Sequence, residues 1–217
     1  MKILVGDTRS RKIIAFLCEH GWGRMLAEER PVNLYPYEPW GFDNGAFESW
    51  KARKPFPEAS FLRRLSVALK FNSDPILAVC PDIVAGGLKS LEFSVRWREK
   101  LPSWPWYLAV QDPEPGTENE YREAVVEVAH LFPGIFLGGT DKFKLQAYRW
   151  SRLAHHCDKK FHYGRAGTLR KLAHAHAVEA DSVDSNLPLW TNERMLSFRD
   201  HKAALESREQ GILPCVT

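Results

Sequence analysis

The chain has 217 residues, of which 44% are hydrophobic and 26% are charged. This composition is that of a globular domain, and it excludes a disordered or collagen-like chain. The length fits one compact domain at the short end of the range for (β/α)8 barrels, so we expect a single domain over residues 1–217. A net charge of +3 is compatible with a polyanionic partner but does not require one.

The cysteines and the first residues indicate a cellular compartment. Cys18, Cys80, Cys157 and Cys215 are scattered and form no Cys-x-x-Cys pair, which argues against a disulfide scaffold or a zinc ribbon. Scattered cysteines are typical of a reducing compartment. The first apolar run, residues 3–5, is too short for a signal peptide or a membrane span. We therefore expect a cytoplasmic protein with no membrane partner.

Short apolar runs occur along the whole chain. They are continuous rather than alternating, which is typical of parallel strands covered on both faces. We expect strands at residues 3–5, 32–35, 41–43, 76–80, 106–110, 135–137, 161–163 and 181–183.

Apolar stripes at helical spacing separate several of these runs. They are Phe61, Leu65, Ala68 and Leu69; Leu91, Val95 and Leu101; Tyr121, Val125, Val128 and Ala129; and Leu169, Leu172 and Ala173. Eight strands alternating with helices favour a TIM-type (β/α)8 barrel of the α/β class. Residues 22–56 show no clear helical pattern, so an open or irregular barrel is an alternative.

Polar residues follow many of the predicted strands, where a barrel carries its catalytic groups. They are Asp43 and Asn44, Asp82, Gln111 and Asp112, Gly138 and Gly139, and Asp184. A single Asp at such a position is more often a helix cap. Several acids at one barrel mouth raise each other's pKa, and such crowding is typical of functional sites.

These residues resemble motifs of the tRNA-guanine transglycosylase superfamily. The segment 43–47, Asp-Asn-Gly-Ala-Phe, is similar to the family's Asp-Ser-Gly-Gly-Phe motif. Pro81-Asp82, the step at Gln111 and the segment 136–139 resemble its second aspartate, its Val-Gln step and its glycine-bearing base-binding loop. Residues 162–184 are similar to its Gly-x-Gly-Thr, helix, Gly-x-Asp-x-Phe-Asp segment in order and spacing. The resemblance covers roughly residues 41–186.

Two family features are missing. The Cys-x-Cys-x-x-Cys zinc motif is absent, so we expect no structural metal, and the Pro-Thr-Arg segment after the nucleophile is replaced by residues 186–190. Both belong to parts of the family associated with tRNA handling, and the chain is much shorter than the tRNA enzymes. It is more similar to the compact branch that inserts 7-deazaguanine into DNA, known in phages and bacterial modification clusters. The resemblance then implies the host cytoplasm if the chain is phage-encoded.

The resemblance implies a role for each matched residue. Asp184 would be the nucleophile at the sugar C1′, and Asp43 would be the general acid and base, as in retaining glycosidases. Asp82, Gln111 and the Gly138–Gly139 backbone would bind the edge of the base. Asn44 and Gly164 would also contact the substrate, and Phe47 or Tyr163 would sandwich the flipped base. The implied partners are DNA, or RNA instead, and a free 7-deazaguanine base such as preQ0 or preQ1, without a cofactor.

We expect some basic side chains to form a nucleic-acid surface, although solvated helix faces are the alternative. Arg9, Lys51 and Arg53 lie in basic clusters near aromatic residues, and Arg165 lies in a glycine-rich turn. The turn at residues 164–168 could bind a phosphate, or it could be an ordinary turn capped by Thr168. Arg63 and Arg64 are interpreted as a solvated helix face.

Other interpretations stay open. The chain could be an RNA-directed transglycosylase, a glycosylase that only removes a base, or a catalytically inactive nucleic-acid-binding barrel subunit. It could also be an unrelated barrel enzyme that uses the 164–168 turn for a phosphorylated substrate. The histidines at residues 155–176 match no zinc spacing and are interpreted as surface or helix-end residues. The sequence does not identify a protein partner.

Overall fold

The computed structural model describes the chain except for residues 28, 30–31 and 210–217. Within the described residues, eight parallel strands form a closed barrel in sequence order, and β8 pairs with β1 to complete it. The strands are β1 (Lys2–Gly6), β2 (Gly23–Leu26), β3 (Gly41–Phe42), β4 (Leu77–Val79), β5 (Trp106–Val110), β6 (Gly134–Leu137), β7 (Lys160–Tyr163) and β8 (Ser182–Ser185). The predicted (β/α)8 barrel is therefore confirmed.

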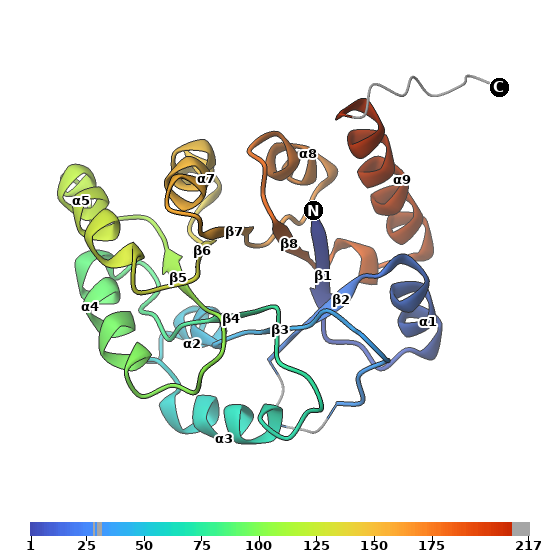
Figure 1. Ribbon diagram of the computed structural model, residues 1–217, viewed down its shortest axis with the longest axis horizontal. Coiled ribbons are helices and arrows are strands. Elements are labelled where there is room, and N and C mark those ends of the chain that lie inside the picture. The colour runs from blue at the N-terminus through green and yellow to red at the C-terminus, as the bar shows by residue number, and fades with distance from the viewer. Residues whose placement is uncertain (28, 30–31, 210–217) are drawn as a thin grey trace.

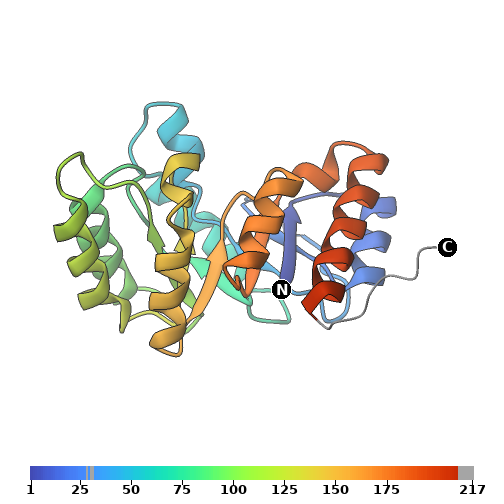
Figure 2. The same ribbon diagram turned by 90° about the horizontal axis from the view of Figure 1, so that it is seen from above.

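Helices surround the strands (Figure 1). They are α1 (Arg11–His20), α2 (Ala46–Lys51), α3 (Glu58–Ala68), α4 (Gly87–Arg98), α5 (Glu118–Ala129), α6 (Asp141–Lys144), α7 (Ala147–His156), α8 (Leu169–Ala177), the 3-10 turn η1 (Leu187–Leu189) and α9 (Asn192–Glu209). Figure 2 shows α9 beside α1, where Phe198 packs edge-on against Trp22 with ring centroids 5.6 Å apart. None of the helices in the described part of the chain has the length and apolar character that a membrane span requires.

The core has two parts because successive side chains of a strand point to opposite faces. Leu4, Leu77 and Tyr107 belong to a small buried cluster, whereas their strand neighbours belong to the large cluster shared with the helices. This alternation places the small cluster inside the barrel. Gly41 belongs to the same interior, because a Cβ there would lie 2.7 Å from the sulfur of Met25.

The second predicted strand is wrong. Residues 32–35 are not in a strand, and the barrel uses β2 instead. The cause is Arg24, a charged residue in the middle of β2 that is only 1% exposed. Its Nε lies 2.6 Å from Oε1 of Glu38, and its Nη2 donates to the carbonyl of Asn33 at 2.7 Å. Because this ion pair places a charged residue inside β2, the strand is not an apolar run in the sequence.

The irregular part of the barrel lies within residues 22–56, where the sequence shows no clear helical pattern. Between β2 and β3, the described residues 27, 29 and 32–40 contain no helix. The short helix α2 follows β3, and α3 then covers the barrel through Phe61 and Leu65. The barrel nevertheless closes, because β2 pairs with both β1 and β3.

The buried ion pair allows a stability test. Replacing Arg24 by Met should lower the free energy of unfolding by about 3–5 kcal/mol, because Glu38 would remain as a buried charge without its partner. Arg63→Met is the matched control, since its pair with Glu29 is exposed, and it should leave stability nearly unchanged. Urea unfolding measures both. Equal effects in the two variants would contradict the structural role of Arg24.

Candidate active site

The carboxyl ends of the strands enclose a cavity of about 580 Å³. Many of the predicted site residues line it, although they are far apart in the sequence: Asp43, Asn44, Phe47, Lys51, Asp82, Gln111, Gly138, Gly139, Arg165 and Asp184. The convergence follows from the parallel barrel, in which all strands end at the same mouth.

Four predicted residues do not line this cavity. Tyr163 is 1% exposed and packs edge-on against His174 with ring centroids 5.7 Å apart, so it cannot sandwich a base in the cavity. Gly164 does not line the cavity. It lies next to Phe136, which does, and a Cβ at Gly164 would be 2.8 Å from that ring. Arg9 and Arg53 are exposed and lie outside the cavity lining.

Asp43 is held by its own loop. Its Oδ1 accepts a hydrogen bond from the backbone N–H of Gly45 at 2.6 Å. Burial raises the pKa of Asp43, and repulsion from Asp184 and Glu48 adds to this effect. The Gly45 hydrogen bond and the charge of Arg64 oppose the shift without cancelling it. Asp43 therefore holds its proton to a higher pH than an ordinary aspartate does.

Arg64 supports the Asp43 loop, and the prediction that this arginine is solvated is wrong. The side chain is buried, and its guanidinium donates to the carbonyls of Asp43 at 3.0 Å and Asn44 at 2.8 Å. Gly45 adopts φ +73, and a Cβ there would lie 2.5 Å from Nη2 of Arg64. Glycine is therefore required both by the backbone and by the guanidinium. Arg63, in contrast, is exposed as expected.

Asp82 is the most deeply buried of the three acids. Asn44 donates to its Oδ1 at 2.6 Å, and the amide of Gln111 donates to its Oδ2. Burial raises the pKa of Asp82 to about 7, with a further contribution from Asp43 and an opposing one from the Asn44 hydrogen bond. Near neutral pH this carboxyl can thus either donate or accept a hydrogen bond.

Asp184 has the opposite electrostatic environment. Burial opposes its ionisation, but hydrogen bonds to Oδ1 from His162 at 3.0 Å and from the backbone N–H of Arg165 at 2.9 Å outweigh that effect. Attraction by His162 and Lys144 helps to keep the pKa of Asp184 below its ordinary value. Both hydrogen bonds use Oδ1, so Oδ2 has no hydrogen bond to any described residue.

His162 is a site residue that the sequence interpretation missed. It is fully buried rather than at the surface, and its ring stacks on Phe136 with centroids 4.9 Å apart. Because a carboxylate only accepts, Nε2 must carry a proton toward Asp184, while Nδ1 lies 2.8 Å from the hydroxyl of Ser182. His162 and Ser182 are register partners on adjacent strands, and the sequence pattern carries no information about this register.

A second cavity of about 490 Å³ continues from the mouth and shares Phe47 and Arg165 with the first. It adds Lys144, which is 2% exposed and donates to the carbonyl of Gly164. Burial, with repulsion from Arg165, lowers the pKa of Lys144 to about 8. The burial of this cation could not be predicted from the sequence, because the charged segment 141–144 has the pattern of a surface turn. The mouth thus carries positive charge next to the acids.

Aromatic and basic side chains combine at Phe47. The guanidinium of Arg165 lies 4.0 Å from its ring centroid, the ammonium of Lys51 lies 5.2 Å away, and Trp50 stacks beside it at 5.8 Å. Trp50 is half exposed. Thr168 caps α8 by accepting from the backbone N–H of Lys171, so the turn at residues 164–168 is a capping turn, and phosphate binding there stays a prediction.

The histidines of the 155–176 region separate in space. His155 contacts Asp181, His162 contacts Asp184, and His174 contacts Tyr163. Among the described residues, no group of three or more His, Cys, Asp and Glu side chains is placed to hold a metal ion. Cys215 lies outside the residues that the structure describes.

Compared with known proteins, the chain matches no protein-family model, and no curated protein is similar enough to count as a match.

The raised pKa of Asp82 has a consequence for stability. The folded state holds this proton more tightly than the unfolded state, so the contribution of Asp82 to stability decreases as pH rises from about 4 to about 7. The total loss is up to about 4 kcal/mol. Asp82→Asn cannot ionise and should gain stability relative to the wild type over this interval. Chemical unfolding at several pH values checks this, and parallel curves for the two proteins would contradict it.

Proposed function

We propose that the chain is a guanine transglycosylase that exchanges guanine in DNA for a 7-deazaguanine base. The observation that carries the proposal is the pair of carboxyls in one cavity with opposite pKa shifts, raised at Asp43 and lowered at Asp184. A retaining exchange at a glycosidic carbon needs such a pair: one proton donor and one ionised nucleophile. The choice of DNA and of a deazaguanine rests on the motif resemblance.

In the proposed first half-reaction, Oδ2 of Asp184 attacks C1′ of the target nucleotide and the C1′–base bond breaks. Asp43 transfers its proton to the leaving guanine, so the nucleotide sugar is held as an ester of Asp184. In the second half-reaction, Asp43 takes a proton from the incoming base, which attacks C1′ and releases Asp184. Each half-reaction breaks one bond at C1′ and forms another. Asp43 gives up a proton in the first and regains one in the second.

Base recognition is assigned to the buried network. Asp82 and Gln111 would give up their mutual contact and pair with the guanine edge, which presents both donors and acceptors. Asn44 remains as the partner that orients Asp82. Phe136, supported from behind by His162, is the ring available to stack on the flipped base. A cavity of about 580 Å³ is large enough for a base with its sugar.

Exchange assays on substituted enzymes test the roles of the two acids. Asp184→Ala should abolish exchange and the covalent adduct, whereas Asp43→Ala should slow exchange by about 10²–10⁴-fold with nucleic-acid binding retained. Asp181→Asn is a matched control, because Asp181 precedes the same strand but pairs with Lys160 outside the cavity. It should keep normal turnover.

Mass spectrometry of nucleosides from DNA incubated with enzyme and base measures the exchange. An Asp184→Ala protein that still exchanges labelled guanine at nearly the wild-type rate would refute the proposal. Release of guanine without incorporation would instead identify a base-removing glycosylase. Exchange with RNA but not with DNA would show that the substrate is RNA.

The His162 contact predicts a pH effect. His162→Phe keeps an aromatic ring against Phe136 but removes the hydrogen bond that lowers the pKa of Asp184. The pKa of Asp184 should then rise, so the acidic limb of the kcat/KM profile should move to higher pH. His174→Phe, which loses only a contact to Tyr163, should leave that limb in place. A lower Tm with an unchanged profile would show that His162 is only structural.

A further inference from the structure

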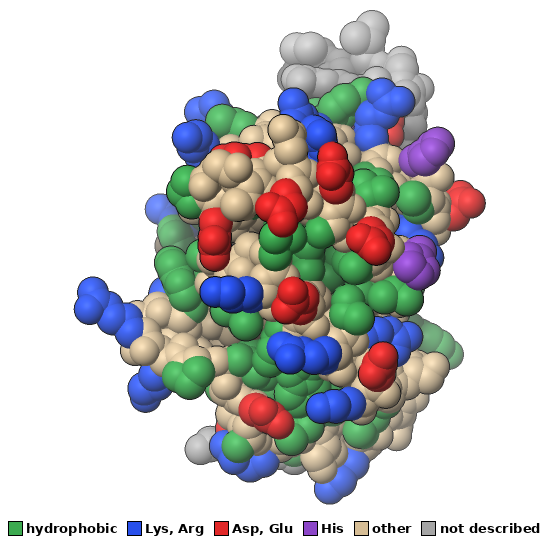
Figure 3. Space-filling model, turned by 90° about the vertical axis from the view of Figure 1, so that its left-hand side faces the viewer, with side chains coloured by type: hydrophobic (Ala, Val, Ile, Leu, Met, Phe, Trp, Pro, Cys, Tyr) green, Lys and Arg blue, Asp and Glu red, His purple; other side chains and the backbone are tan. Residues whose placement is uncertain are grey.

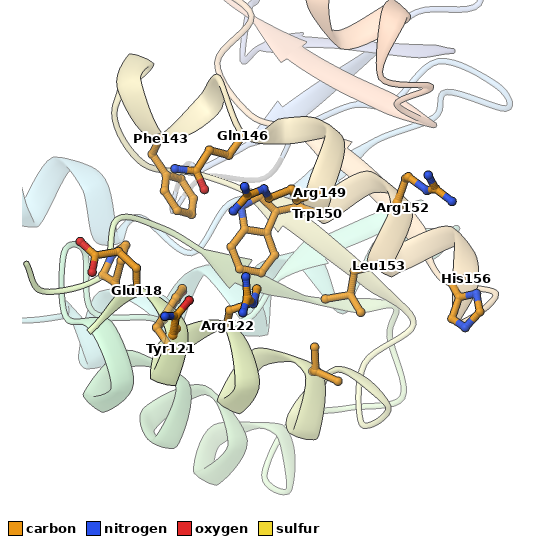
Figure 4. A pocket seen from close by; sticks show the side chains of 13 residues that line it. Glu118, Tyr121, Arg122, Phe143, Gln146, Arg149, Trp150, Arg152, Leu153 and His156 are labelled. Carbon is orange, nitrogen blue, oxygen red and sulfur yellow. The ribbon is translucent and has the colours of Figure 1, made fainter. Parts of the chain in front are cut away.

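The short helix α6 lies between the barrel mouth and the outer flank of the molecule. On the outer side, Phe143 packs against Trp150 with ring centroids 5.7 Å apart, and Figure 4 shows both rings beside a groove between α5 and α7. Figure 3 shows that flank, with charged side chains of both signs around hydrophobic ones. On the inner side, the next residue, Lys144, lines the second cavity of the mouth and is 2% exposed. α6 therefore holds a cation in the interior, next to the candidate active site.

The ammonium of Lys144 is buried without an acidic partner. It donates to the carbonyl of Gly164 and lies 5.2 Å from the ring centroid of Tyr163. No acid in the described part of the chain forms an ion pair with it, whereas Lys171 pairs with Asp141 at 2.6 Å. Burying a charge without a counter-ion is costly, and perturbed buried charges cluster at functional sites. The burial of this lysine therefore indicates a role in the site.

The carbonyl that Lys144 contacts belongs to the same peptide group as an N–H that contacts Asp184. The C=O of Gly164 and the N–H of Arg165 are the two ends of one planar trans peptide, so they point in opposite directions. Lys144 donates to the oxygen at one end, and the N–H at the other end donates to Oδ1 of Asp184 at 2.9 Å. The peptide dipole is negative at the oxygen and positive at the N–H, so its orientation is favourable toward both charges. A buried cation and the candidate nucleophile are thus connected through a single peptide group.

The backbone at Arg165 needs support to keep its conformation. Its φ of +54 lies in the left-handed region, which residues other than glycine rarely adopt. Such a conformation persists only where the surrounding contacts determine it. Lys144 holds the peptide before Arg165, and after it the N–H of Ala166 donates to the carbonyl of Asp184 at 2.7 Å. The Lys144 contact is charge-assisted, so it is stronger than a hydrogen bond between neutral groups.

We propose that Lys144 is a positioning residue of the active site, which fixes and polarises the Gly164–Arg165 peptide so that its N–H holds Oδ1 of Asp184. The proposal rests on the proposed function in taking Asp184 as the nucleophile. Hydrogen bonds in series polarise one another, so the ammonium strengthens the bond to the carboxylate without forming an ion pair with it. The direct attraction between the two charges acts in the same direction, because Lys144 lowers the pKa of Asp184.

Nuclear magnetic resonance of the isotope-labelled protein without substrate tests the proposal. The amide resonance of Arg165 senses the carboxylate of Asp184, so its titration midpoint in acid reports the pKa of that carboxyl. Lys144→Met should move this midpoint to higher pH and shift the resonance at neutral pH, since it removes both the contact and the charge. The acid titration step should be absent in Asp184→Asn.

Lys142→Met is the matched control, because Lys142 is an exposed lysine of the same helix, and it should change neither the midpoint nor the resonance. A Lys144→Met protein with the wild-type midpoint and resonance would overturn the proposal, whatever its Tm. The other charged groups that face Asp184 or Lys144 are the same in the wild type and in both lysine variants. They are Asp43 after β3, Asp141 of α6, His162 of β7, Arg165 after β7 and Lys171 of α8.

The wild type supplies a second measurement in case Lys144→Met does not fold. Burial, with repulsion from Arg165, lowers the pKa of Lys144 to about 8, so the ammonium loses its charge as pH rises through that value. The amide resonance of Arg165 should then show a second titration step near this pH, and the step should remain in Lys142→Met. A resonance that stays constant through this range would overturn the proposal.

Exchange kinetics connect the Lys144 contact to the reaction. Lys144→Met should lower kcat by about tenfold or more and leave KM nearly unchanged, because Lys144 acts on Asp184 rather than on the bound base. Lys144→Arg keeps the charge and should restore part of kcat. A wild-type kcat in Lys144→Met would overturn the positioning role and leave the proposed function intact. If the wild type exchanges no base, the proposed function fails, whereas the resonance measurements still decide whether Lys144 acts on Asp184.

Discussion

The hydrogen bonds of β8 close the barrel and also place its nucleophilic candidate. β8 pairs with β7 on one side and with β1 on the other, and its register sets His162 opposite Ser182. Ser182 and Asp184 share one face of β8 because they are two residues apart. His162 can therefore contact both of them at once. A one-residue slip of β8 would turn Asp184 to the other face of the sheet and remove both contacts.

Three acids at one mouth would repel one another if all were ionised in the same environment. The structure separates them by giving each a different set of neighbours. Asp184 receives two donors on one oxygen, Asp43 receives one backbone donor, and Asp82 is the most deeply buried. Negative charge is thereby concentrated on Asp184, where Lys144 and Arg165 are nearby. The unequal charge of the acids thus arises from burial, hydrogen bonding and the charges of neighbouring side chains.

The sequence predicted the parts of the site that follow from strand polarity. Asp43, Asp82 and Gln111 each follow a strand of a parallel barrel, so their convergence needs no knowledge of packing. The prediction for Tyr163 was wrong because successive side chains of a strand point to opposite faces. His162 points into the barrel interior, so its neighbour Tyr163 points toward α8. Whether those residues perform the proposed chemistry stays a prediction.

The buried charges could not be predicted in the same way. Arg24 and Lys144 are residue types that usually lie at the surface, and their burial is stabilised by groups 9 to 20 residues away in the sequence. A local pattern contains no information about such partners. The missed strand β2 has the same cause, because its central residue is one of these charges.

Two buried arginines, Arg24 and Arg64, hold a segment of the chain that has no helix. The described residues between β2 and β3 form no helix, so the carbonyls of this part of the chain lack the usual backbone partners. Arg24 donates to the carbonyl of Asn33, and Arg64 donates to those of Ala27 and Asp43. Each guanidinium carries five N–H donors in a rigid plane, so one side chain can hold several carbonyls in a fixed arrangement. Arg24 and Arg64 therefore hold the segment between β2 and β3, where a regular barrel would use a covering helix, and Arg64 also fixes the Asp43 loop.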